Sequence, residues 1–293
     1  GVSYLDDRLA GLLEAASASG ELPASHGELA HQAAHAWAAA RGTALPVIQL
    51  CGADRASKRA IAAAACAHVG LGLYILRGES LPIHAAELDA FMRLWQREAI
   101  LDGCALLIEL PERDSAEPQR ESAVARLLED LRGALILSSE NRRLMLQRRV
   151  TTLEVDKPTK TEQRALWQQQ LGSAGAALNG NLDAIGSQFN FAANAIRSAS
   201  DEALQAHSDG GDLSGALWDS CRAHARPRLN DLAQRIVALA GWDDLVLPDA
   251  QKQILRQIAV QVRQRAKVYD AWGFGVAGAR GQPALLAGPP GAG

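Results

Sequence analysis

The sequence has little net charge, few aromatic side chains and no long apolar run. Its formal net charge is −3 at pH 7 and aromatic residues make up 4% of its 293 residues. A chain so balanced has no overall basic surface, so a nucleic-acid partner is not expected. Apolar runs stay well short of the roughly 20 residues that a membrane-spanning helix needs, and no signal peptide opens the chain. We therefore expect no membrane association.

The sequence also lacks the spacings that mark disulfide frameworks and metal sites. Its cysteines, Cys51, Cys66, Cys104 and Cys221, form no C-x-x-C pair, which favours free, buried thiols in a reducing cytoplasm. His31 and His35 stand one helical turn apart, a spacing that can bind zinc, but the catalytic Glu of H-E-x-x-H and a third ligand are missing. We interpret the two histidines as helix-surface residues and predict no metal centre.

The last six residues form the most informative motif. Residues 283–287 make a short apolar run typical of a buried strand, and they lead into Gly288, Pro289, Pro290, Gly291, Ala292 and Gly293. A strand followed by G-x-x-x-x-G opens a phosphate-binding loop, which continues with Lys and then Ser or Thr. The alternative is a flexible Gly/Pro-rich tail. The motif favours a nucleotide site, and we expect this chain to be a fragment that ends inside it.

Short apolar runs alternate with helical patterns in the first half of the chain. The predicted strands lie at residues 47–50, 73–76, 105–108, 134–137 and 152–155, and the helices between them at 58–69, 84–100 and 121–131. Such alternation predicts an α/β fold: a parallel sheet like that of P-loop NTPases, with helices on both faces.

The pattern divides the chain into five parts. We predict a helical N-terminal segment of two helices at 1–44, an α/β core at 45–157 and an all-helical lid at 158–206. A linker and helix follow at 207–240, and the start of a second P-loop module at 241–293.

The loop after the first predicted core strand is a diverged copy of the same motif. It reads G-x-x-x-x-S-K-R, with Gly52 and Lys58 at the spacing of a phosphate loop. Ser57 replaces the glycine of the tight turn, and Arg59 replaces the hydroxyl that coordinates Mg²⁺. At the end of the third predicted strand, Glu109 retains a carboxylate for the metal side. Leu110 stands where a general base is needed, so this first site is not expected to hydrolyse a nucleotide.

The order of these features resembles the AAA+ ATPase family. The resemblance rests on the strand order, on Asn141 after the fourth strand, on Arg148 and Arg149 before the fifth, and on Pro158 at the start of the helical region. Trp242–Pro248 and the terminal glycine motif resemble the entry into a second AAA+ module. The chain also resembles the large tandem ATPases that accompany bacterial contractile injection systems, in which a diverged first module precedes an active second one.

The resemblance implies roles for residues of this chain. Asn141 or Ser139 falls near a polar sensor position, and Arg148 or Arg149 near an arginine that reaches the nucleotide of a neighbouring subunit. The final lid helix offers Ala192 or Asn194 where a sensor arginine is expected. The complete protein is then a cytoplasmic, homo-oligomeric ring that binds ATP with Mg²⁺, hydrolyses it at the second module, and remodels or assembles a protein partner.

Two other functions are open on the sequence alone. One is a non-catalytic interaction scaffold with the same fold, in which neither nucleotide site matters. The other is a nucleic-acid-dependent P-loop ATPase of the helicase-loader kind, which predicts a strongly basic face that the balanced charge does not favour.

Overall fold

The computed structural model describes residues 5–17, 20–40, 44–110, 118–141, 147–176, 178, 181–208, 210–225, 241–266 and 268. They divide into two compact units. The first unit comprises Gly1–Gln170 with Phe191–Ser198, and the second comprises Leu171–Asn190 with Ala199–Gly293. Within the described residues no helix is both long and apolar enough to cross a bilayer.

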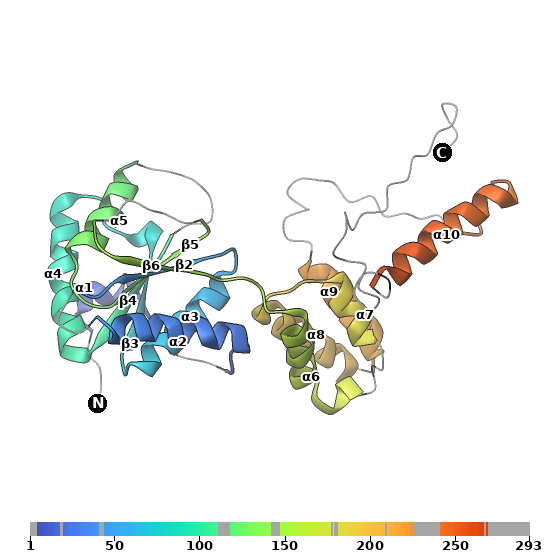
Figure 1. Cartoon of the computed structure of the whole chain (residues 1–293), viewed down its shortest axis with the longest axis horizontal. Coiled ribbons are helices and arrows are strands. Elements are labelled where there is room, and N and C mark those ends of the chain that lie inside the picture. Colours follow the sequence, from blue (N-terminus) through green and yellow to red (C-terminus); the bar gives the residue numbers. More distant parts are fainter. Residues whose placement is uncertain are drawn as a thin grey trace. The chain divides into compact units, whose positions relative to one another are not determined.

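The first unit is built on a six-stranded sheet (Figure 1). Its strands are β1 (Leu13–Ala16), β2 (Val47–Cys51), β3 (Gly72–Arg77), β4 (Cys104–Glu109), β5 (Leu135–Ser139) and β6 (Val150–Glu154). They lie in the order β1-β3-β4-β5-β2-β6. The five predicted strands are all present and pair in parallel, as expected from their unbroken apolar runs.

The N-terminal segment differs from the prediction of two helices. Helix α1 (Asp7–Ala10) is a single turn, and β1 follows it and pairs antiparallel with β3, with Leu13 opposite Leu76. Strand β1 covers the backbone N–H and C=O groups that β3 would otherwise expose at the sheet edge. The spacing of the leucines suited a helix, but pairing at this edge decided the strand. The prediction of a helix was wrong for this stretch.

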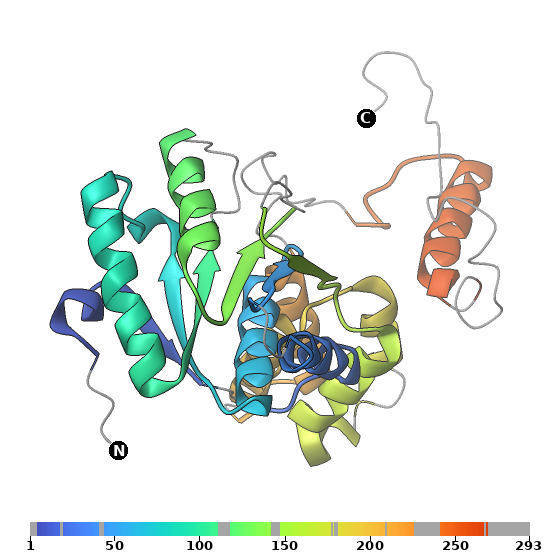
Figure 2. The same ribbon diagram turned by 60° about the vertical axis from the view of Figure 1, so that its left-hand side comes forward.

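Helices cover both faces of the sheet, as predicted (Figure 2). On one face lie α4 (Ala85–Asp102) and α5 (Pro118–Asp130) together with α1, and their apolar side chains pack on Leu106, Ile108 and Leu137. On the other face lie α2 (Ala24–Ala38) and α3 (Arg55–His68), packed on Leu50, Ile75 and Leu107. A short 3₁₀ turn, η1 (Gly78–Ser80), follows β3.

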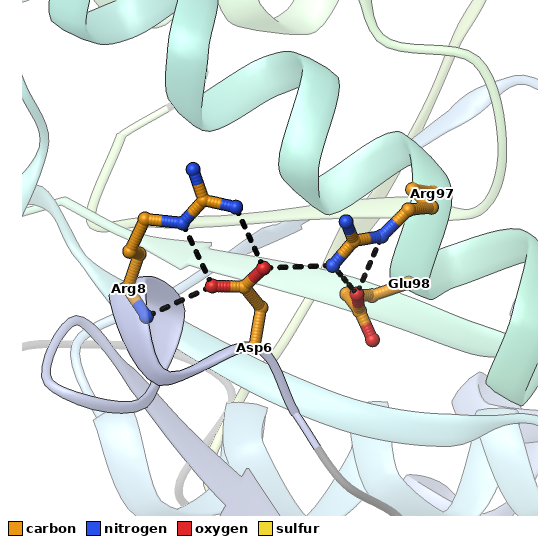
Figure 3. Close-up of polar contacts among 4 residues, drawn as sticks. All are labelled: Asp6, Arg8, Arg97 and Glu98. Atoms are coloured by element: carbon orange, nitrogen blue, oxygen red, sulfur yellow. Dashed lines mark hydrogen bonds and ion pairs between the residues drawn. The ribbon is translucent and has the colours of Figure 1, made fainter.

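An ionic network joins the N-terminal segment to α4 (Figure 3). The Asp6 carboxylate accepts from the Arg8 backbone N–H and from the guanidinium groups of Arg8 and Arg97 at 2.8–3.0 Å. Arg97 also donates to Glu98, which is 5% exposed. The hydrogen bonds from Arg8 and Arg97 hold the pKa of Asp6 well below its ordinary range. The network fixes the entry to β1 against α4.

Two helices run from the first unit into the second, α6 (Lys160–Ala176) and α8 (Ala193–Ser208). The second unit also contains α7 (Asn181–Gln188), α9 (Leu213–His224) and α10 (Asp249–Ala266). Buried side chains of this unit include Ile185, Ala203 and Leu217, and the Phe189 and Trp218 rings make an edge contact at 5.6 Å. Asp212 caps α9, its carboxylate accepting from the backbone N–H groups of Ser214 and Gly215. Residues 226–240 lie outside the described residues.

Glu162 ties the start of α6 to the start of α2. Its carboxylate accepts from the backbone N–H of Thr159 at 2.7 Å and of Ser25 at 2.6 Å, and from both hydroxyls. Thr159 and Glu162 thus form a capping box. Burial alone raises the pKa of Glu162, but these hydrogen bonds outweigh it and lower the pKa to about 2.

We expect Glu162→Gln to cost about 1 kcal/mol of unfolding free energy at pH 7, a value kept small by solvent exposure. A carboxyl whose folded pKa lies at about 2, below its ordinary 4.5, stabilises the fold above pH 4.5 and loses that contribution as the pH falls toward 2. Urea unfolding of both proteins across this range should therefore show the difference shrinking with acid. Glu28→Gln, an exposed position on α2, is the control, and a difference independent of pH would contradict the assignment.

Candidate functional site

The predicted first phosphate loop lies at the carboxyl ends of β2, β4 and β5, where parallel sheets bind ligands. Gly52 follows β2 with φ +150°, and a Cβ at this position would stand 2.3 Å from the Val155 carbonyl oxygen. Its N–H donates to the Ser139 carbonyl at 3.1 Å. The glycine is thus required by the close approach of the segment after β6.

The start of α3 is already occupied by an anion of its own chain. Asp54 caps this helix, and its carboxylate accepts from the Ser57 N–H at 2.9 Å. In a phosphate loop the N–H groups at this helix start face the phosphates. A fixed carboxylate there uses one of these donors and repels a phosphate.

Lys58 is turned into the protein. It is 4% exposed, and its Nζ donates to the carbonyl oxygens of Gly52 at 2.6 Å and Ser139 at 2.9 Å. A lysine that binds phosphate extends its ammonium group toward the ligand. Here the ammonium group instead ties the end of β2 to the end of β5.

Arg59 and Glu109 form a two-pronged ion pair at the position expected for magnesium. Arg59 Nε lies 2.6 Å from Glu109 Oε1, and Arg59 Nη2 lies 2.7 Å from Oε2. Glu109 is 3% exposed, and its hydrogen bonds raise the pKa of Arg59. Mg²⁺ binds through oxygen ligands in octahedral geometry and prefers carboxylates and water. With both carboxylate oxygens held by a guanidinium group, these residues do not fit a magnesium ion.

The predicted sensor residue lies at the end of β5. Buried Ser139 donates from its Oγ to the Asn141 carbonyl at 2.8 Å and accepts from Gln49 at 3.0 Å. This network fixes the backbone of Asn141, whose side chain is exposed. Among the described residues, no group of three or more His, Cys, Asp or Glu could hold a metal ion, and the exposed His31 stacks on His68.

The two candidate inter-subunit arginines have different surroundings. The guanidinium group of Arg148 donates to the carbonyl oxygens of Leu45, Leu128, Leu131 and Gly133 at 2.6–3.2 Å. It thereby covers the C-terminal end of α5, and burial lowers its pKa. Arg149 is exposed. Of the two, Arg149 is the one whose side chain can reach another molecule.

We expect Arg148→Ala to lower the free energy of unfolding by about 2 kcal/mol, since it leaves several carbonyl groups without their donor. Arg149→Ala is the matched neighbour and should change stability by no more than about 0.5 kcal/mol. Thermal or urea unfolding of the two variants measures the difference. Equal effects would show that the contacts of Arg148 contribute nothing.

A pocket of about 260 Å³ lies beside the diverged loop, within the first unit. Its lining includes His26, Ser57, Asn194 and Arg197. Asn194 was considered at the sequence level, but His26 and Arg197 were missed. Arg197 lies three residues after Asn194, hence on the same helix face, which is the signal that could have found it. The terminal glycine motif at 288–293 lies outside the described residues.

Comparison with known proteins bears on the helical region. Residues 159–227 match the model of the contractile injection system ATPase helical domain. No curated protein matches the sequence. Among solved structures, Trip13 of Rhizobiales has a TM-score of 0.41 and 15% sequence identity, over 67% of this chain and 87% of its own. The helical-domain match confirms a relation predicted from the sequence: residues 159–227 of this chain are similar to the helical domain of contractile injection system ATPases.

Proposed function

We propose that the α/β unit is a catalytically silent first AAA+ module, a structural and regulatory platform in an ATP-driven machine. The observation that carries the proposal is the Arg59–Glu109 ion pair at 2.6 and 2.7 Å. Phosphoryl transfer depends on a metal ion that neutralises charge on the phosphates and on a group that orients the attacking water. Here a guanidinium group holds the metal-side carboxylate.

The base position supports the same conclusion. Leu110 follows Glu109 directly, is 8% exposed, and has a side chain that cannot accept a proton. Lys58, which is expected to meet phosphate, donates to two backbone carbonyls. Hydrolysis needs a carboxylate for the metal ion, a base and a lysine for the phosphate. In this unit Glu109 is paired with Arg59, Leu110 stands at the base position, and Lys58 binds backbone carbonyl groups.

In the complete protein we assign ATP hydrolysis with Mg²⁺ to a second module, whose entry is residues 241–293 and whose phosphate loop is the terminal glycine motif. The protein would act in the cytoplasm as a homo-oligomeric ring that remodels or assembles a protein partner, with Arg149 facing a neighbouring subunit. The relation of residues 159–227 to contractile injection system ATPases supports this assignment.

ATP turnover tests the proposal. This chain should show none above background, and Lys58→Met should leave that result unchanged. In the protein extended past Gly293, turnover should survive Lys58→Met within about twofold but disappear when the lysine expected after Gly293 is replaced by Ala. Turnover by this chain that Lys58→Met abolishes would overturn the silent module. If the extended protein also shows no ATP turnover, the second module is not a hydrolase, and the result favours the non-catalytic interaction scaffold.

A further inference from the structure

Strand β1 leaves one edge of the sheet open. It stands first in the strand order and pairs only with β3. Among the described residues, the backbone groups of Leu13–Ala16 make no hydrogen bond besides those of this pairing. In an antiparallel pair only every second residue points its N–H and C=O toward the neighbouring strand, so the others point outward. Glu14, Ala15 and Ser17 are exposed, and this edge is therefore accessible.

The side chains of β1 do little to prevent a further strand from pairing there. Edge strands are commonly protected by proline, by lysine or another charge, or by being short. Strand β1 has no proline and no lysine, and its one charged residue, Glu14, lies 3.4 Å from Arg59 and 3.3 Å from Arg77. Two guanidinium groups thus compensate the carboxylate. The strand has four residues, which limits an added strand to few backbone hydrogen bonds.

The pocket of the first unit borders this open edge. Its lining includes residues 14–17 without a gap. Successive residues of a strand point to opposite faces of the sheet, so a space that all four line must reach the backbone edge between the faces. Ala56, Ala60 and Ala63, on one face of α3, also line it. Its volume of about 260 Å³ is below the roughly 300–1,000 Å³ of small-molecule sites, which favours side chains of an extended peptide.

Arg197 gives the pocket a positive charge. Its guanidinium group donates to the Glu21 carbonyl oxygen at 3.1 Å, and in the described part of the chain it forms no ion pair with a carboxylate. Glu14 and Arg59, which also line the pocket, are both held in ion pairs. A carboxylate on the added strand therefore complements Arg197.

We propose that the open edge of β1 binds an extended segment of a protein partner, which adds a strand to the sheet. An apolar side chain of this segment packs on the α3 alanines, and an Asp or Glu side chain meets Arg197. Alternate side chains of a strand share a face, so the segment alternates in character. A second copy of this chain is a poorer occupant, because its β1 would bring another Glu14 to this edge and offer the pocket only small alanine side chains.

Selection of random peptides of about ten residues, displayed on phage against this chain, tests the site. The selected peptides should alternate in polarity and contain Asp or Glu. In fluorescence anisotropy, N-methylation of alternate peptide amides should weaken binding at least about tenfold, since those amides can no longer donate to the edge. Ala60→Leu, which fills the pocket, and Arg197→Ala should have effects of the same size. Arg197→Lys and Ala67→Leu, an exposed position elsewhere on α3, should change binding by less than about threefold.

Two further measurements identify the mode of binding. Replacing the acidic residue of the peptide by its amide should weaken binding to the unaltered protein but not to Arg197→Ala, as expected for a direct pair. The peptide should also slow hydrogen exchange of the outward amides of residues 14–17.

The proposal is overturned if no peptide is selected, or if the selected peptides tolerate N-methylation or bind equally to Ala60→Leu and Arg197→Ala. It is also overturned if light scattering shows a dimer in which the outward amides of β1 already exchange slowly, because a second copy then occupies the edge. None of these measurements involves ATP turnover, so their outcome is separate from that of the proposed function.

Discussion

Arg59→Met should destabilise the first unit by about 3 kcal/mol. It removes the partner of Glu109, which is 3% exposed, and a buried carboxylate without its cation is costly. Urea unfolding at pH 7 measures the loss.

The double variant Arg59→Met with Glu109→Met distinguishes the net contribution of the ion pair from the cost of leaving one buried charge unpaired. Replacing both charges by apolar groups of similar length should recover stability to within about 1 kcal/mol of the unaltered protein. Arg77→Met is the matched control, since Arg77 is exposed and meets the exposed Glu14 at 3.3 Å, so it should cost at most about 0.5 kcal/mol. If Arg59→Met behaves like Arg77→Met, the ion pair does not stabilise this site.

Gly52→Ala should cost about 3 kcal/mol or more. The backbone at this position has φ +150°, and the new Cβ would meet the Val155 carbonyl oxygen at 2.3 Å. Because the obstructing atom belongs to the backbone, relief requires a shift of the segment after β6. Thermal unfolding measures the loss, and the Lys58 contact to the Gly52 carbonyl should weaken with it.

Gly103→Ala is the control, because it tests the cost of a positive φ at a position where the new Cβ meets no other atom. Gly103 also has a positive φ, +62°, but a Cβ there would have nothing within 4 Å. It should cost only about 1 kcal/mol, the penalty of a left-handed residue without a clash. Equal losses at the two glycines would mean that the approach of Val155 does not matter.

The parallel core could be predicted from the sequence because the patterns that specify its strands and helices lie within short stretches of the chain. Strands buried on both faces need continuous apolar runs, such as residues 105–108, and intervening helices need their own periodicity. The resemblance to AAA+ ATPases was stated on similar grounds, because residues such as Gly52, Lys58 and Glu109 follow predicted strands at the spacing of that family's motifs. The sequence also showed that Arg59 stands where the phosphate-loop motif has a Ser or Thr hydroxyl.

The pairing of Glu109 with Arg59 was decided by tertiary structure. Arg59 and Glu109 are 50 residues apart, and the register of neighbouring parallel strands brings the end of β4 beside α3. The same holds for Lys58, whose carbonyl acceptor at Ser139 is 81 residues away. Strand β1 also depended on a distant edge, that of β3. The sequence by itself determined which strands and motifs exist, whereas only the packing of distant segments decided which side chains would meet, because contact between residues far apart leaves no local periodicity to detect.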